Sequence, residues 1–212
     1  MIKAVFFDVD GTLVDSDGPI VYAVQAAFSE AGLRQPTTRQ ILKFAGYPAL
    51  DWIDCVLREL QVNRDPTPLA EATVKILRHH LEKHGSQIPG ASKTLTTLKK
   101  LGVKLIVVSN GSSKSLPSEL KEAKLWHFFD EVIGVEQLVI PKPNSDSFVH
   151  IMSKLKLKPI ECLYVGDTQI DYEYARGAHV PFALLKNHRN HSVKADYHLK
   201  KFSDLTKVVS KC

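Results

Sequence analysis

The fold of this chain is decided by one stretch near its start, Ile2-Lys3-Ala4-Val5-Phe6-Phe7-Asp8-Val9-Asp10-Gly11-Thr12-Leu13-Val14-Asp15-Ser16. Its apolar run Val5-Phe6-Phe7 has strand propensity and ends in two carboxylates, Asp8 and Asp10. Open α/β sheets bind ligands where their strands end, and Gly11 gives the backbone the freedom to leave the strand there. Because two nearby carboxylates repel each other, a divalent metal ion between them is the natural third component. The stretch therefore predicts a strand followed by a metal-binding loop.

The composition is that of a globular protein. The 212 residues include 44% hydrophobic and 24% charged residues, which suits one domain or a core with a small insertion. No apolar run approaches membrane-spanning length and no signal-peptide pattern precedes the strand, so we expect a cytoplasmic protein that does not bind a membrane. The net charge of +5 comes from dispersed lysines rather than a basic run interleaved with aromatic residues, so nucleic-acid binding is not expected.

The cysteines and histidines suggest no second site. The cysteines are too few and too scattered for a disulfide framework or a zinc site, and they are Cys55, Cys162 and Cys212. Cys162 stands beside an apolar strand and is expected to be buried. The clustered histidines lack acidic or cysteine partners at metal-ligand spacing and are expected at the surface: His79, His80, His84, His188 and His191.

Only helical patterns follow the first strand over a long segment. Apolar residues recur at helical spacing from Pro19 to Gly32, from Thr38 to Ala45, from Ala49 to about Leu60, and in a fourth stretch through His84. Because nothing here reads as a strand, the segment interrupts an α/β pattern. We therefore predict that residues 16–85 form an inserted helical cap, with linkers near residues 14–18 and 85–90.

Strands and helices alternate after the cap. The predicted strands are Val103 to Val108, Glu131 to Gly134, Glu161 to Val165 and Val180 to Leu185. The predicted helices are Ala91 to Leu101, Pro117 to Lys124, Ser145 to Leu155, Ile170 to Ala178 and a closing helix from Ser203 to Val209. This alternation predicts an α/β fold with a doubly wound parallel, Rossmann-like sheet, formed by residues 1–15 and 86–212.

Polar residues end three of the predicted strands. They are Asp8 with Asp10, Ser109 with Asn110, and Asp167. Because the carboxyl ends of parallel strands share one sheet edge, residues more than 150 positions apart are expected to converge there. Ser109-Asn110-Gly111 can offer a hydroxyl and backbone N–H groups to a phosphate oxygen, and it is equally ordinary turn chemistry.

Two further motifs carry charges that suit the same edge. Lys142 stands between Pro141 and Pro143, and beside an acidic metal site it can neutralise both a carboxylate and an incoming phosphate. The segment Gly166-Asp167-Thr168-Gln169-Ile170-Asp171 adds two carboxylates, one at a strand end and one in the first turn of the next helix.

These motifs, in this order and at this spacing, resemble the four motifs of the haloacid dehalogenase superfamily, in its branch of phosphoglycolate phosphatases and β-phosphoglucomutase-like enzymes with a helical cap. The resemblance implies that Asp8 is the nucleophile that forms an aspartyl-phosphate and that Asp10 is the general acid and base. It implies that Lys142 organises the charges of the site. Phosphate contacts would come from Gly11, Ser109, Asn110 and Lys142. Mg²⁺ would be held by Asp8, Asp167 and the main-chain carbonyl of Asp10, with Asp171 in support.

The relatives differ at identifiable positions. Dehalogenases resemble this site at the first aspartate but lack the second, so the presence of Asp10 argues against dehalogenation. Phosphonate-cleaving relatives use a cap lysine, but the surroundings of Lys43 do not resemble theirs. The phosphosugar mutases carry an arginine close behind a cap glycine, whereas the first arginine after Gly46 is Arg58. The Gly46-Tyr47-Pro48 pattern looks more like phosphoglycolate phosphatases.

The expected function is Mg²⁺-dependent hydrolysis of a small phosphorylated metabolite of the phosphoglycolate type, by a monomer or small homo-oligomer. Alternatives are a phosphosugar mutase and a catalytically idle protein that binds phosphate ligands. On the cap, Arg39 and Lys43 lie at i and i+4 and can reach a second anionic group of the substrate, or form a solvated basic face. Trp52 is expected in the cap core and Tyr47 on the cap's underside.

Overall fold

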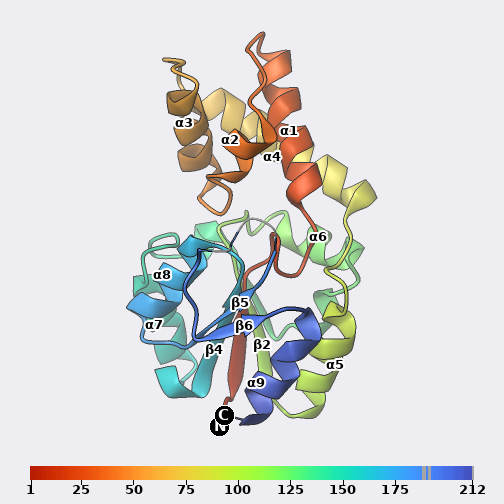
Figure 1. Ribbon diagram of the computed structural model, residues 1–212, viewed down its shortest axis with the longest axis vertical. Coiled ribbons are helices and arrows are strands. Elements are labelled where there is room, and N and C mark those ends of the chain that lie inside the picture. Colours follow the sequence, from red (N-terminus) through yellow and green to blue (C-terminus); the bar gives the residue numbers. More distant parts are fainter. Residues whose placement is uncertain (188–189, 191, 212) are drawn as a thin grey trace.

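The protein is described by a computed structural model that covers residues 1–187, 190 and 192–211 (Figure 1). Cys212, His188 and His191 lie outside these described residues. A six-stranded sheet with the order β3-β2-β1-β4-β5-β6 forms the centre, and every neighbouring pair is parallel. Its strands are β1 (Ala4–Phe7), β2 (Lys104–Val108), β3 (Glu131–Ile133), β4 (Cys162–Gly166), β5 (Phe182–Leu185) and β6 (Tyr197–Leu199). The predicted doubly wound parallel sheet is confirmed.

The central position of β1 brings the predicted motifs to one edge. Phe7 is paired with Val107 of β2 and with Val165 of β4. All three strands end within two residues of these pairs, so Asp8 directly follows β1, while Ser109 follows β2 and Asp167 follows β4. The register of three adjacent strands therefore sets residues from distant parts of the sequence side by side, as the alternation predicts.

Helices cover both faces of the sheet because side chains of β1 alternate between two apolar clusters. Val5 and Phe7 belong to one cluster, and Ala4 and Phe6 belong to the other. The first cluster includes residues of α5 (Ala91–Lys100), α6 (Leu116–Glu122) and α9 (Leu205–Lys211). The second includes residues of α7 (Asp146–Lys154) and α8 (Gln169–Gly177), which Figure 1 places on the opposite side. Short 3-10 helices are η1 (Trp126–Phe128), η2 (Val135–Gln137), η3 (Pro159–Glu161) and η4 (Phe202–Asp204).

Four helices stand above the strand ends in Figure 1 and have a core of their own. They are α1 (Asp17–Glu30), α2 (Thr38–Leu42), α3 (Ala49–Glu59) and α4 (Thr67–His84). Trp52 is buried among them, and its Nε1 donates a hydrogen bond to the carbonyl of Ile41 at 3.0 Å. The expectation that Trp52 packs in the cap core is confirmed.

Two neighbouring chain segments join the helical cap to the sheet. Asp15 N donates to Ser86 O at 2.9 Å, and Ile88 N donates to Leu13 O at 2.8 Å. Leu81, near the end of α4, packs with the sheet's cluster rather than with the cap core. The division into residues 16–85 and a core of residues 1–15 and 86–212 stays a prediction, supported by the separate apolar cluster of the cap.

Several elements differ from the expectations. β6 was not predicted. It is a three-residue strand at the edge of the sheet, beside β5, and the residues before it are mostly polar. α2 ends at Leu42 rather than near Ala45, and α6 ends at Glu122 rather than at Lys124. Cys162 is buried, as expected. None of the described helices is long and apolar enough to cross a membrane.

Candidate active site

Lys142 is the centre of the predicted site. Its Nζ donates hydrogen bonds to Asp8 Oδ1 and Asp171 Oδ1, each at 2.7 Å, and to the hydroxyl of Tyr164 at 3.0 Å. Lys142 is only 2% exposed, and both carboxylates are buried as well. The loop that carries Lys142 thus delivers one ammonium group to the end of β1 and the start of α8.

Burial and neighbouring charges perturb the pKa values of these groups. The pKa of Asp8 is raised to about 7: burial is the largest cause, the charges of Asp171 and Asp10 add to it, and Lys142 opposes it. Burial alone would lower the pKa of Lys142, but the charges of Asp171 and Asp8 hold it well above its ordinary value. Lys142 therefore stays charged at neutral pH, whereas Asp8 is held close to its titration point.

Asp167 is fixed from three sides. Thr12 Oγ1 donates to Asp167 Oδ1 at 3.2 Å, and Asn187 Nδ2 donates to Oδ2 at 2.8 Å. Asn190 Nδ2 donates to the main-chain carbonyl of Asp167 at 2.9 Å. Gly11 has φ +74°, and a Cβ at that position would lie 2.6 Å from Asp167 Oδ2. Only glycine allows the loop after β1 to pass this close to the carboxylate.

Asp171 is fixed by the first turn of α8. Thr168 Oγ1 donates to Asp171 Oδ2 at 2.6 Å, and Asp171 N is bonded to Thr168 Oγ1 at 3.2 Å, which completes a capping box. One carboxylate oxygen of Asp171 thus caps the helix while the other accepts from Lys142.

The carboxylates can hold a divalent cation. Asp8, Asp167 and Asp171 each offer an oxygen, and these atoms lie within 4.8 Å of one another. Asp8 and Asp171 share the ammonium group of Lys142, and Asp167 adds a third buried carboxylate near them, so this arrangement favours a further positive charge. All the side-chain donors are hard oxygens, which suits Mg²⁺. The Asp10 side chain lies outside this group; the ligand role implied for its main-chain carbonyl stays a prediction.

Ser109 and Asn110 follow β2 at the same edge. Ser109 Oγ accepts a hydrogen bond from Gly111 N at 3.0 Å. Asn110 Nδ2 donates to the carbonyls of Gly46 and Lys142 at 2.8 and 2.9 Å, and Asn110 Oδ1 accepts from Lys142 N at 3.0 Å. The Asn110 amide thus bonds the cap and the Lys142 loop. The phosphate contacts implied for both residues stay predictions.

A cavity of about 530 Å³ lies between this edge and the cap. Asp8, Asp10, Ser109, Asn110 and Gly111 line its core side. The cap contributes apolar and aromatic side chains together with two cationic residues of α4, and the members used below are Tyr47, Trp52, Lys75 and Arg78. A partly open cavity with charged residues on one side and both apolar and cationic residues on the other is typical of a small-molecule site.

Arg39 and Lys43 do not line that cavity. They line a neighbouring one of about 890 Å³, together with Asp167 and Thr168, and Lys43 Nζ pairs with Glu59 Oε2 at 2.6 Å. Tyr47 lines both cavities and is 39% exposed, which agrees with a place on the cap's underside.

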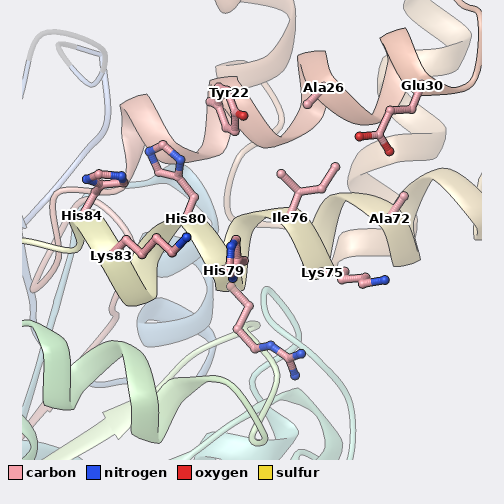
Figure 2. A pocket seen from close by; sticks show the side chains of 11 residues that line it. Tyr22, Ala26, Glu30, Ala72, Lys75, Ile76, His79, His80, Lys83 and His84 are labelled. Carbon is pink, nitrogen blue, oxygen red and sulfur yellow. The ribbon is translucent and has the colours of Figure 1, made fainter.

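Figure 2 shows a third cavity, of about 880 Å³, between α1 and α4 on the cap. Tyr22 reaches down from α1, and its ring centroid lies 4.7 Å from that of His80. His79 and His84 are exposed, as predicted, but His80 is half-buried. Burial lowers the pKa of His80, and His84 and His79 lower it further.

Several site residues were missed in the sequence. Tyr164 donates to Val108 O at 2.9 Å and accepts from Lys142, and it was assigned only to a buried strand. Asn187 and Asn190 follow β5, so the rule that polar groups gather at strand ends was the signal that could have found them. Lys75 and Arg78 lie within α4 and not at a strand end, so the sequence did not point to them. Whether their side chains face the cavity depends on how α4 packs.

Comparison with known proteins agrees with this geometry. The family model described as haloacid dehalogenase-like hydrolase matches residues 5–185. A phosphoglycolate phosphatase of Pseudomonas syringae pv. tomato is 30% identical over 198 residues, which cover 89% of this chain and 71% of that protein. A phosphoglycolate phosphatase of Aliivibrio fischeri is 31% identical, with 84% and 81% covered.

Solved structures share the fold. A predicted phosphoglycolate phosphatase from Haemophilus somnus superposes with a TM-score of 0.88 at 24% identity, with 98% of each chain covered. A β-phosphoglucomutase from Clostridium difficile gives a TM-score of 0.85 at 18% identity, with 100% of this chain and 96% of that chain covered. The resemblance noted in the motifs is confirmed. The chain therefore belongs to the haloacid dehalogenase-like hydrolase family, as an enzyme of its phosphatase branch.

Proposed function

We propose that this enzyme is a Mg²⁺-dependent phosphatase that hydrolyses a small organic phosphomonoester, with phosphoglycolate as the favoured type. The observation that carries the proposal is the buried contact of Lys142 with both Asp8 and Asp171, with Asp167 as a third carboxylate near them and a cavity above them that the cap covers. This is the charge arrangement that transfer of a phosphoryl group requires.

Asp8 is the proposed nucleophile. A bond forms between an oxygen of Asp8 and phosphorus while the bond from phosphorus to the ester oxygen breaks, which leaves an aspartyl-phosphate and a free alcohol. Asp10, which lines the same cavity, gives a proton to the leaving oxygen. It then takes a proton from the water that attacks the phosphoryl group and returns Asp8 as a carboxylate.

Charge stabilisation is the proposed task of Lys142. Its ammonium group is held in place by three hydrogen bonds before substrate arrives, so little reorganisation is needed when negative charge develops on the phosphoryl oxygens. Asp8 and Asp167, with the main-chain carbonyl of Asp10, would hold Mg²⁺, which supplies further positive charge to the phosphoryl group when bound.

The substrate class rests on the relatives and on the cavity. The curated relatives named above are phosphoglycolate phosphatases, and a structural neighbour, CbbY from Rhodobacter sphaeroides, was solved in complex with phosphate. Lys75 and Arg78 line the cap side of the cavity opposite Asp8, so they are placed to attract the carboxylate of a phosphorylated acid.

The test is phosphate release from a panel of small phosphomonoesters, with Mg²⁺ or a chelator, for the wild type and Asp8→Asn. We expect release that needs Mg²⁺ and is abolished in Asp8→Asn. Full activity in Asp8→Asn would overturn the nucleophile. Formation of an isomer without net phosphate release would favour a mutase, and ligand binding without turnover would favour a catalytically idle protein.

A further inference from the structure

The side chain of Asn110 joins two parts of the molecule that approach the site from opposite sides. Its Nδ2 donates to the carbonyl of Gly46, in the loop between α2 and α3, at 2.8 Å. It also forms two hydrogen bonds with the backbone of Lys142, one to the carbonyl at 2.9 Å and one from the amide at 3.0 Å. Asn110 is 8% exposed, so water competes little for these bonds.

The cap side of this connection is weakly held by its own backbone. Residues 43–48 form the loop that descends toward the strand ends in Figure 1. Its two ends have ordinary bonds, Lys43 N to Arg39 O at 3.1 Å and Trp52 N to Pro48 O at 2.9 Å. The bonds of its middle are long: Phe44 N to Ile41 O is 3.3 Å, and both Ala45 N to Leu42 O and Tyr47 N to Phe44 O are 3.4 Å. The bond from Asn110 to Gly46 is shorter than all three, and it ties the loop to the core.

Gly46 is also seated closely on the core. Its φ is +106°, and a Cβ at that position would lie 3.3 Å from Ile170 Cδ1 and 3.4 Å from Thr168 Cγ2. Both contacts belong to the start of α8, where Asp171 accepts from Lys142. Gly46→Ala therefore strains the loop at its bond with Asn110, through the positive φ and the tight contact with Ile170, and its nearest new contacts lie at the start of α8 rather than on the Lys142 loop.

The core side depends on Asn110 in an unusual way. Lys142 stands between two prolines, which have no N–H groups, so its amide is the only backbone donor in the segment Pro141-Lys142-Pro143. That donor is bonded to Asn110 Oδ1. The side-chain amide of Asn110 therefore sets the position of the backbone from which the Lys142 ammonium group reaches Asp8.

We propose that Asn110 is a positioning residue that couples the seating of the cap loop, residues 43–48, to the position of Lys142. When the loop is in place, the Gly46 carbonyl accepts a bond from Asn110. The side-chain amide of Asn110 is then fixed and keeps both of its bonds to the backbone of Lys142. When the loop lifts, Asn110 loses one of its three bonds and its hold on Lys142 weakens. The lysine is then fully organised only while the cap covers the site.

The decisive experiment measures amide hydrogen exchange by NMR in the metal-free, substrate-free full chain, so it does not depend on activity. In Asn110→Ala, the amides of Lys142 and of residues 43–47 should exchange at least about tenfold faster, because each loses a hydrogen bond or its anchor. In Gly46→Ala, the Lys142 amide should also exchange faster, although Gly46 has no bond with Lys142. Ser109→Ala is the matched control: among the described residues Ser109 Oγ has a local bond, from Gly111 N, so this variant should leave both segments at the wild-type rate.

Faster exchange of the amides of residues 43–47 in Gly46→Ala, with an unchanged Lys142 amide, would overturn the coupling. So would an equal effect of Ser109→Ala. If Asn110→Ala does not fold, Gly46→Ala still decides the matter.

The kinetic readout rests on the proposed phosphatase function. Asn110→Ala and Gly46→Ala should each lower kcat, and the double variant should lose little more than the worse single variant, because both remove the same connection. Independent, multiplying losses would contradict the coupling. A wild type without phosphatase activity would remove the proposed function but leave the exchange result intact.

Discussion

The Nζ atom of Lys142 lies 2.7 Å from Oδ1 of Asp8, and both side chains are buried although 134 positions separate them in the sequence. A cation at this distance holds the proposed nucleophile in one orientation. In the proposed mechanism it also stabilises the charge that develops on the phosphoryl group. The proposal therefore gives this contact a part in both stability and catalysis, and the two can be separated by measurement.

Lys142→Met keeps the length of the side chain and removes its charge. We expect the phosphatase rate to fall about 100- to 1,000-fold, which corresponds to ~3–4 kcal/mol, the usual cost of losing one group that stabilises a transition state. Steady-state kinetics checks the fall, and a thermal unfolding curve shows whether the variant is folded. Tyr164→Phe is the control: it removes one hydrogen bond to Nζ but leaves the charge, so it should cost far less than Lys142→Met. Equal losses would contradict the assignment of charge stabilisation to Lys142.

The free energy of unfolding should depend on pH through Asp8 in the metal-free protein. Its pKa is raised from 3.8 to about 7, so the folded state binds this proton more tightly than the unfolded state. The stabilisation is fully present below the unfolded pKa and is lost as the pH rises through the folded pKa. The stability difference between wild type and Asp8→Asn should therefore shift against the wild type as the pH rises from 3.8 to about 7.

Urea unfolding of both proteins at several pH values tests this, and the comparison cancels groups that titrate alike in both. Glu136 is such a group: burial alone would raise its pKa, but hydrogen bonds from Ser112 and Ser113 lower it to about 2. Curves for the two proteins that stay parallel across the whole range would contradict the raised pKa of Asp8. Addition of Mg²⁺ should flatten the wild-type curve, because a bound cation favours the ionised carboxylate.

The features that could be predicted from the sequence are those that depend on local patterns. The apolar run Val5-Phe6-Phe7 and the alternation of strands and helices after residue 91 were enough to predict a parallel sheet. Because the carboxyl ends of parallel strands lie at one edge, Asp8, Lys142 and Asp167 were then expected together. The bonding of Asn110 could not be predicted, because its partners lie 64 and 32 positions away in segments without secondary structure. Arg39 and Lys43 were candidates for a substrate contact by helix periodicity alone, but the packing of the cap turns them toward another cavity. Edge strand β6 was missed because three residues give too short a pattern.

Gly11→Ala should weaken metal binding more than it weakens the fold. The added Cβ would lie 2.6 Å from Asp167 Oδ2, so the carboxylate must move from the place where it can share a cation with Asp8. Gly102→Ala is a matched control: Gly102 has φ +75°, close to the +74° of Gly11, and nothing lies within 4 Å of its added Cβ. Both variants should lose ~1–3 kcal/mol of stability through backbone strain. Only Gly11→Ala should also need more Mg²⁺ for half-maximal activity, measured by titration, and an unchanged requirement would show that Asp167 is not a ligand.

Arg78→Gln should change which esters the enzyme prefers. Arg78 lines the cap side of the cavity that contains Asp8, whereas Arg39 lines the neighbouring cavity. If Arg78 attracts the carboxylate of phosphoglycolate, its loss should raise KM for that ester by about tenfold, the lower end for a hydrogen bond to a charged group, because the side chain is exposed. KM for 2-hydroxyethyl phosphate, which has a neutral hydroxyl in place of the carboxylate, should stay the same. Arg39→Gln should leave both KM values unchanged. An equal rise in KM for both esters would mean that Arg78 acts on the phosphate group or on the cap as a whole. An effect of Arg39→Gln alone would mean that the substrate carboxylate binds in the neighbouring cavity.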